Sequence, residues 1–478
     1  MTRTLVVALA LETACAVNPV TGKRQLSLVS EPEEIQLGQQ GEADVGKSIG
    51  FTDAPKAQAY VAELGKRLSA LTQRPGLPWT FHVVDDPSVN AFALPGGQIN
   101  VTRGLLAYVN SEAELAGVVG HECGHVAAKH SVTQMTDQEL AQVGLGLGSL
   151  FSPTLGQVAG AGMQLLFLKY SRADESMADS LGFDYMTAAG YDPRQMLALF
   201  DTLGRVQKAA GSHLPQWLET HPDPGNRRQA IEQRMADAHK DFAGAKVDRD
   251  AILAVAEGLV FGADPRQGFF KGTTFFHPAL KFQLDFPAGW KTQNSPQAVV
   301  GVSPQHDAAL QLASAGTASP DAAAKQFFSQ QGVQAGTALA ARKLNGLDAV
   351  EGGFSATDSN GAPLAGTAAF IQLGGATWAL VGFAPQASAA AAHPALEAAI
   401  ASFRPLTDPA ALGVQPAHVE LVRVESDMTV DEFNQRHPST IPVTEVAVIN
   451  GLADGKATLK GGARAKRVTG SAPAVSMR

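Results

Sequence analysis

The strongest chemical signal in the sequence is the segment His121-Glu122-Cys123-Gly124-His125. In an α-helix, residues four apart lie on one face about one turn from each other, so both imidazoles can reach the same tetrahedral Zn²⁺ ion. Glu122 then lies beside the metal, where it can take a proton from an attacking water as a general base. This H-E-x-x-H pattern therefore predicts a hydrolytic zinc site.

A catalytic zinc site needs a third protein ligand and an open position for water. His130 does not have the metzincin spacing, because the eleventh motif position is Ser131, and we interpret His130 as a structural or surface histidine. Glu175 fits better, since it lies on a separate predicted helix with Asp179 four residues further along the same face. Asp179 can orient a ligand histidine through its free ring nitrogen. The alternative is that Glu175 and Asp179 belong, with Asp174, to a solvated acidic helix face.

Capping residues and hydrophobic periodicity indicate the elements that must position these side chains. Ser111 has the residue type and context of a helix N-cap, and the helical pattern that follows runs through His130. A separate helix begins near Ser171 and carries Glu175 and Asp179. The candidate ligands therefore come from two different helices.

Upstream of the motif, the sequence predicts helices followed by a small sheet. Residues 31–71 have helical periodicity. Residues 79–84 alternate between apolar and polar side chains, as a half-buried strand does. Residues 90–101 carry the turn Pro95-Gly96-Gly97 between two extended runs, which is typical of a β-hairpin.

Residues 140–168 contain no charged side chain, and the segment is long enough to cross a bilayer. Six glycines, Pro153, Gln157 and Gln164 interrupt it. We therefore expect a helical hairpin that covers the active site or enters the membrane interface. A transmembrane helix is the alternative.

The N-terminus resembles a bacterial lipoprotein signal. Arg3 precedes an apolar run at residues 5–11, and the small residue Ala14 stands directly before Cys15. Glu12 stands where such signals usually carry an aliphatic residue, so an N-terminus without a signal is the alternative. Lipidation of Cys15 would hold an otherwise soluble enzyme at a membrane surface.

The C-terminal half differs in residue composition and in hydrophobic pattern. After about Asp264 the sequence changes to Phe-rich alternating runs with an Ala-rich helical segment at residues 320–331. Residues 270–406 therefore read as an α+β domain with an antiparallel sheet and a closing helix at residues 394–403. The order of a strand and two helical segments in residues 417–470 resembles a LysM module, which suggests peptidoglycan as a partner.

Length and charge limit the possible classes of protein. A chain of 478 residues is too long for one hydrophobic core, so we expect two or three domains. The formal net charge of −8 leaves no excess of Lys and Arg to neutralise phosphates, which argues against nucleic acid as a partner. The predicted fold class is multidomain α+β: a signal at residues 1–15, a mostly helical zincin-type peptidase domain with a small sheet at 27–262, the α+β domain at 270–406 and a LysM-like tail at 417–470.

Five motifs in order resemble the membrane-associated zinc peptidases that include HtpX, the CAAX prenyl protease and the BepA-like periplasmic proteases. The resemblance covers residues 31–237. Its motifs are Asn90-Ala91-Phe92-Ala93-Leu94-Pro95-Gly96-Gly97, Val101-Thr102-Arg103-Gly104-Leu105-Leu106, His121-Glu122-Cys123-Gly124-His125, Ser171-Arg172-Ala173-Asp174-Glu175-Ser176-Met177-Ala178-Asp179 and Thr220-His221-Pro222.

The resemblance implies roles for further residues. The third zinc ligand of the family falls on Glu175, which gives His121, His125 and Glu175 as the ligands of one Zn²⁺ per chain. His221 matches a histidine that approaches the metal, where it can stabilise an oxyanion or occupy the open position in a resting state. Arg227 could pair with the carboxylates of the site. The strand formed by Asn90, Ala91, Phe92 and Ala93 would bind an extended peptide by main-chain hydrogen bonds.

The sequence therefore predicts a zinc-dependent metalloendopeptidase of the bacterial cell envelope. We expect it on the periplasmic side, anchored at the membrane surface through Cys15, and acting on unfolded or misassembled polypeptides. One alternative is a catalytically silent binding or chaperone module of the envelope. Another is a metal hydrolase of a different substrate class, which would leave the hairpin and the His221 turn without a function.

Overall fold

The computed structural model describes residues 15–144, 170–209, 217, 221, 224–358 and 361–470. These residues divide into two compact units. The first unit contains the described residues up to Gly262 together with Ala417–Gly470, and the second contains Ala263–Pro416. The chain therefore leaves the first unit and later returns to it.

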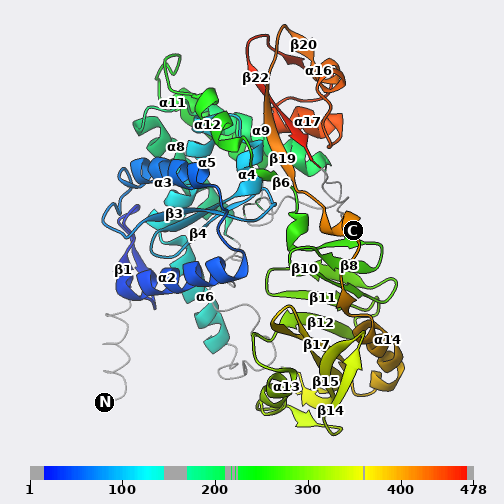
Figure 1. Ribbon diagram of the computed structural model, residues 1–478. Helices are drawn as coiled ribbons and strands as arrows, with labels where there is room; N and C mark the ends of the chain where they lie inside the picture. The colour runs from blue at the N-terminus through cyan, green and yellow to red at the C-terminus, as the bar shows by residue number, and fades with distance from the viewer. Residues whose placement is uncertain are drawn as a thin grey trace, which may run out of the picture. The chain divides into compact units, whose positions relative to one another are not determined.

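The first unit is mostly helical. Its helices before the second unit are α2 (Glu31–Ser48), α3 (Pro55–Ser69), α4 (Arg103–Tyr108), α5 (Glu112–Ala127), α6 (His130–Gly144), α8 (Arg172–Ala188), α9 (Arg194–Ala209), α11 (Pro224–Asp237) and α12 (Arg249–Ala256) (Figure 1). Its strands there are β1 (Cys15–Val17), β2 (Arg24–Leu26), β3 (Thr80–Val84), β4 (Ala91–Leu94), β5 (Gln98–Thr102) and β6 (Val260–Phe261). The helical pattern at residues 31–71 thus forms two helices, because the chain turns at Gly50, which has a φ of 86°, before Pro55 starts α3.

The small sheet has the strand order β3-β5-β4. Strands β4 and β5 are antiparallel and are joined at Pro95-Gly96-Gly97, so the predicted hairpin is present. Gly96 and Gly97 have φ values of 76° and 108°, which a glycine adopts without the strain that other residues would meet. Strand β4 lies at the edge of this sheet.

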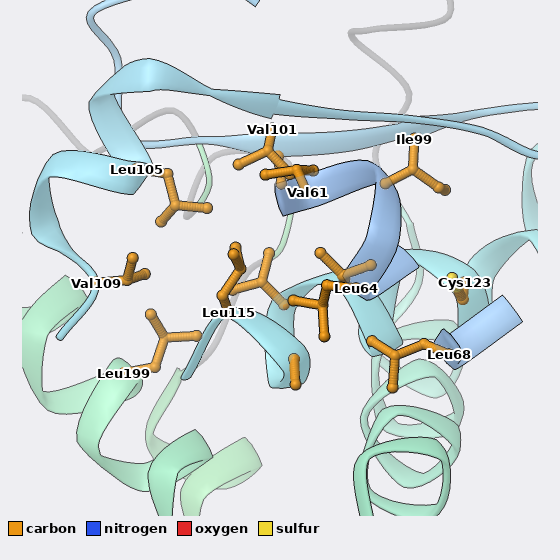
Figure 2. Close-up of a cluster of buried hydrophobic side chains, with 14 of the residues drawn as sticks. Val61, Leu64, Leu68, Ile99, Val101, Leu105, Val109, Leu115, Cys123 and Leu199 are labelled. Atoms are coloured by element: carbon orange, nitrogen blue, oxygen red, sulfur yellow. The ribbon is translucent and has the colours of Figure 1, made fainter. Parts of the chain in front are cut away.

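Helix α3 packs against both β3 and α5. Figure 2 shows side chains of α3, β5 and α5 facing one another, among them Val61, Leu64 and Leu68 of α3, Ile99 and Val101 of β5, and Leu115 and Cys123 of α5. Cys123 is fully buried in this cluster. The apolar face of α5 is held against the core, so its opposite face can present His121 and His125 to α8.

Helices α5 and α8 pack at backbone contact. A Cβ atom built on Gly182 of α8 would lie 2.8 Å from the backbone nitrogen of His121 and 3.2 Å from the carbonyl carbon of Gly120. Both contacts are shorter than ordinary van der Waals separations, so only a glycine allows this approach. The spacing brings side chains of the two helices to a common point.

Helix α5 ends earlier than its sequence pattern predicted. The predicted helix ran through His130, but α5 ends at Ala127, Lys129 has a φ of 59°, and α6 begins at His130. A left-handed residue interrupts the helical ladder and redirects the chain. His130 therefore does not continue the face of α5.

The C-terminal segment belongs to the first unit. Its elements are β19 (Ala417–Arg423), β20 (Met428–Thr429), α16 (Val430–Arg436), α17 (Val443–Ile449), β21 (Thr458–Leu459) and β22 (Arg464–Thr469). Strand β19 pairs with β22 on one side and with β6 on the other, so the segment shares a sheet with residues that precede the second unit. Its strand and helices follow the predicted order, while its relation to LysM modules and to peptidoglycan stays a prediction.

A buried lysine fastens this segment to the chain just before α5. The Nζ atom of Lys466 donates hydrogen bonds to the carbonyl oxygens of Ala107 at 2.8 Å and Val109 at 2.9 Å. Arg205 of α9 donates to the carbonyl oxygen of Gly451 at 3.0 Å. The segment therefore contacts the connection that leads into the motif helix.

The second unit is an α+β domain with antiparallel sheets, as predicted. Its sheets have the orders β10-β11-β12-β17-β16-β15-β13, with β14 also pairing with β15, and β18-β9-β8-β7. The strands are β7 (Phe269–Lys271), β8 (Thr274–His277), β9 (Phe282–Asp285), β10 (Lys291–Asn294), β11 (Ala298–Val302), β12 (Ala309–Ser314), β13 (Gln334–Ala335), β14 (Ala340–Leu344), β15 (Leu347–Thr357), β16 (Pro363–Leu373), β17 (Ala376–Pro385) and β18 (Arg404–Pro405). Helices α13 (Pro320–Phe328) and α14 (Ala389–Ala401) pack against the larger sheet. The predicted closing helix therefore begins at Ala389 and contains Pro394.

Two predictions fall largely outside the described residues. The signal at residues 1–15 is described only at Cys15, and the uncharged segment at 140–168 only as far as Gly144. Among the helices of the described ranges, none combines the length and the apolar character that crossing a bilayer requires.

Candidate metal centre

Four buried side chains from separate parts of the sequence meet at one point. They are His121 and His125 of α5, Glu175 of α8, and His221. One nitrogen or oxygen atom of each lies within 4.8 Å of the corresponding atom of the other three. Two imidazoles, a carboxylate and a third imidazole form a donor set that suits Zn²⁺.

The distances among these atoms fit a tetrahedral ion. The Nε2 atoms of His121 and His125 are 3.0 Å apart, and they lie 3.6 Å and 3.5 Å from the two carboxylate oxygens of Glu175. Ligand atoms about 2.1 Å from a tetrahedral centre lie about 3.4 Å from each other. The side chains are thus arranged as ligands of one small ion.

His221 occupies the remaining side of the cluster. Its Nδ1 atom lies 3.3 Å from Nε2 of His121 and 2.8 Å from a carboxylate oxygen of Glu175. Burial, followed by the charge of Arg227, lowers the pKa of His221 to about 3. A neutral imidazole keeps the lone pair that a metal ligand needs.

Glu122 lies beside the cluster and is fully buried. One of its carboxylate oxygens is 3.6 Å from Nε2 of His221. Burial, followed by the nearby charge of Glu175 and against the opposing effect of Arg227, raises the pKa of Glu122 to about 8. A buried carboxyl group with a shifted pKa beside a candidate metal site is a candidate general base.

Asp179 and Arg227 contact the residues of the cluster and orient them. Asp179 lies 3.0 Å from Nδ1 of His121, and Arg227 binds both oxygens of Asp179, through Nη2 at 2.6 Å and Nε at 2.7 Å. Nη1 of Arg227 is also 3.1 Å from Glu175. Burial alone would raise the pKa of Asp179, but the Arg227 guanidinium outweighs it and holds this pKa well below its usual value.

The acidic helix face that served as the alternative is only partly solvated. Glu175 and Asp179 are 1% and 2% exposed, whereas the side chain of Asp174 is 36% exposed. The capping box formed by Ser171 and Asp174 starts α8 and turns Glu175 inward. The described geometry favours the ligand interpretation of Glu175 over a solvated face.

The candidate substrate strand lies next to the motif helix. Asn90 immediately precedes β4, and Ala91, Phe92 and Ala93 belong to it. Strand β4 packs against α5, and within the described residues it pairs only with β5. Its main chain can therefore pair with an added strand.

Two residues that sequence reasoning did not assign to the centre contact His125. His130 is buried, and its Nδ1 atom lies 3.0 Å from Nδ1 of His125, so of the two expected roles the structural one agrees with its position and the surface one does not. The ring of Tyr170 stacks on His125 with 3.9 Å between the ring centroids. No spacing rule points to either residue, because both positions depend on where α5 ends and on how α8 packs.

Comparison with known proteins shows where the chain has relatives. The model of Peptidase family M48 matches residues 55–235. Mitochondrial metalloendopeptidase OMA1 of Schizosaccharomyces pombe is 29% identical over 224 residues, which cover 46% of this chain and 66% of that protein. The protein of the same name from Arabidopsis thaliana is 37% identical over 171 residues, covering 35% of this chain and 34% of that protein. The Beta-barrel assembly-enhancing protease of Escherichia coli (strain K12) is 30% identical over 247 residues, covering 48% and 50%.

The chain spans between about a third and two thirds of the length of these relatives. The range matched by the family includes every residue of the four-residue cluster. It ends before the second unit and the C-terminal segment begin.

Proposed function

We propose, from the premise that residues 55–235 form a domain of peptidase family M48, that this chain is a zinc-dependent metalloendopeptidase. The observation that carries the proposal is the convergence of His121, His125 and Glu175 on one point with Glu122 beside them. These are the groups that peptide hydrolysis at a zinc site requires.

His121, His125 and Glu175 would hold one Zn²⁺ ion per chain. An ion bound there supplies Lewis-acid polarisation of the scissile carbonyl and lowers the pKa of water. Asp179 orients His121 through its Nδ1 atom, and Arg227 neutralises the charge that Asp179 and Glu175 bring into a buried site.

Glu122 performs the proton transfers. As the oxygen of water bonds to the carbonyl carbon, the proton of the water passes to the Glu122 carboxylate. When the C–N bond breaks, Glu122 returns that proton to the leaving amine nitrogen, so the base is regenerated. The burial of Glu122 keeps bulk water away from both transfers.

His221 closes the cluster in a resting state. Its contacts with His121 and Glu175 support the inference that it lies where a substrate carbonyl would have to approach. Movement of His221 out of this position would admit the substrate. A histidine N–H that stays nearby can then stabilise the negative charge that develops on the carbonyl oxygen.

Strand β4 would bind the substrate as an added strand. Main-chain pairing with an extended peptide would involve Asn90, Ala91, Phe92 and Ala93. Such pairing is independent of most side chains, which suits an enzyme that accepts many sequences.

We infer that the substrates are unfolded or misassembled polypeptides of the bacterial cell envelope. The enzyme would reach them from the periplasmic side, anchored at the membrane through Cys15. The relative named as a Beta-barrel assembly-enhancing protease supports this choice.

The deciding experiment measures zinc content and casein cleavage of the purified full chain and of Glu122→Gln and Glu175→Ala. We expect about one zinc per wild-type chain and cleavage, retained zinc without cleavage in Glu122→Gln, and lost zinc in Glu175→Ala. If wild type binds zinc but never cleaves, even with His221→Ala to open the site, the chain is instead a binding or chaperone module.

A further inference from the structure

His125 makes a contact that the proposed mechanism does not use. Its Nε2 atom faces the cluster, 3.0 Å from His121, so its Nδ1 atom faces away and lies 3.0 Å from Nδ1 of His130. Two ring nitrogens at this distance share one proton, because one must donate and the other must accept. The two histidines therefore determine each other's tautomer.

Metal binding decides which nitrogen donates. A histidine that binds through Nε2 keeps its proton on Nδ1, so His125 is the donor and Nδ1 of His130 is the acceptor. The proton of His130 is then on Nε2. That atom lies 3.4 Å from a carboxylate oxygen of Asp174, a polar contact without hydrogen-bond geometry.

Asp174 connects this pair to the helix of the third ligand. Its other carboxylate oxygen accepts hydrogen bonds from the backbone nitrogen of Ser171 at 3.1 Å and from the hydroxyl of Ser171 at 2.7 Å. The bond from the Ser171 backbone belongs to the capping box at the start of α8, and Glu175 is the next residue. A line of polar contacts thus runs from His125 to the N-terminus of the helix that carries Glu175.

The end of α5 explains how His130 reaches this position. In a continuous helix, residue 130 would be rotated about 140° around the axis from residue 125. The left-handed conformation of Lys129 breaks the helix, and the first residue of α6 turns back toward His125. His130 is only 5% exposed, so its ring is held in place by packing.

We propose that His130 is a positioning residue whose Nδ1 atom accepts the Nδ1–H of His125 and holds Nε2 of His125 toward the metal. The inference rests on the proposed function only in that His125 is a zinc ligand. His121 has a carboxylate, Asp179, in the corresponding place. The centre therefore supports its two histidines differently, one through an anion and the other through a neutral imidazole.

The test is the zinc affinity of the full chain, measured by competition with a chromophoric chelator. Outer partners of metal-binding histidines contribute about 10–100-fold to metal affinity, so we expect a loss of this size in His130→Leu, which has no acceptor. In His130→Asn the side-chain oxygen lies near the position of Nδ1 and should restore most of the affinity. In His130→Gln the amide reaches the position of Nε2 instead and should restore little.

His82→Leu is the control, since His82 pairs with Glu42 elsewhere in the first unit, and its zinc affinity should equal that of wild type. Thermal unfolding of the zinc-free variants separates a positioning role from a folding defect, because the Asn and Gln variants should unfold alike. Equal zinc affinities for Asn and Gln, or a Leu variant that binds as wild type does, would overturn the role of His130 and leave the proposed function intact. Absence of zinc binding by wild type would contradict the proposed function itself.

Discussion

Arg227 is the residue on which the electrostatics of the metal centre depend most. It is the cation nearest to Asp179 and Glu175, and its guanidinium also lies over the ring of Trp217, 4.5 Å from the ring centroid. Burial opposes its charge, but the buried carboxylates outweigh burial and raise the pKa of Arg227. The charges of the site therefore depend on one another, and removing one leaves the others buried without compensation.

Replacing Arg227 should destabilise the first unit strongly. Arg227→Met leaves Asp179 and Glu175 buried without their cation, and losing one partner of a buried pair costs about 3–5 kcal/mol. Denaturant unfolding of the zinc-free chain measures the change. The neighbouring Arg228 pairs with Asp201 on the surface, so Arg228→Met should change the free energy of unfolding by less than about 1 kcal/mol. Similar effects of the two substitutions would contradict this account.

At the scale of elements, the approach of α5 to α8 sets the distance between the ligands. Gly182→Ala places a Cβ atom against the backbone of His121, and since backbone cannot rotate away, the helices must separate. We expect weaker zinc binding, because Glu175 moves away from the two histidines, and a loss of about 1–3 kcal/mol in the free energy of unfolding. Zinc competition and denaturant unfolding measure the two effects.

Gly204 of α9 is the matched control for this substitution. It is also a glycine within a helix of the first unit, but a Cβ atom there meets no atom within 4 Å. Gly204→Ala should leave zinc affinity unchanged and stabilise the chain by about 0.5–1 kcal/mol, because alanine has the higher helix propensity. Equal zinc affinities in Gly182→Ala and Gly204→Ala would show that the helix contact does not control the site.

In the second unit, the interaction of Glu351 on β15 with Glu397 on α14 predicts a pH dependence. Burial first, and then the charge of Glu397 against that of Arg342, raises the pKa of Glu351 to about 7. Because an unfolded glutamate titrates near pH 4.3, the folded unit binds more protons between about pH 4.3 and 7. Its stability therefore falls as pH rises through this window and is level above it.

Glu351→Gln should remove this contribution. Calorimetry of the full chain at pH 5 and pH 7.5 should show the stability of the variant, relative to wild type, rising with pH. Asp348→Asn is the control, since Asp348 is an exposed residue of the same strand and should show no such rise. A difference between Glu351→Gln and wild type that does not depend on pH would contradict the shifted pKa.

At the scale of the whole molecule, the C-terminal segment returns to complete the first unit. Besides a core of its own, the segment contributes four buried residues to an apolar cluster shared with residues that precede the second unit, namely Ala107, Ala256, Phe261, Ala417, Val419, Ile449 and Val468. A tethered binding module would not share a core and a sheet in this way. We therefore expect the segment to contribute to the stability of the peptidase domain.

A chain that ends at Pro416 tests this expectation. It loses the strand that pairs with β6 and exposes the shared cluster, so the thermal midpoint of the first unit should fall by about 5 °C or more. Calorimetry of the two zinc-free chains gives the comparison. An unchanged midpoint would indicate a module that is merely linked to the peptidase domain.

Much of the centre is local and could be predicted from the sequence. The spacing of His121 and His125, the N-caps at Ser111 and Ser171, and the glycine turn between β4 and β5 each depend on a few neighbouring residues. Together the motifs indicated the family that residues 55–235 match. Helix ends were less predictable, since the left-handed conformation of Lys129 leaves no clear trace in the residue pattern.

Taken by itself, the sequence determined which residues could bind a metal and on which helices they lie, because helical periodicity and capping act over a single turn. Only the tertiary structure decided that Glu175 meets the histidines, that Arg227 pairs with two carboxylates, and that His130 contacts His125. It also decided that the C-terminal segment shares a core with the peptidase domain. The physical reason is that these contacts join residues far apart in the sequence. Local conformational preferences do not bring such residues together, so the contacts depend on how closely the helices pack.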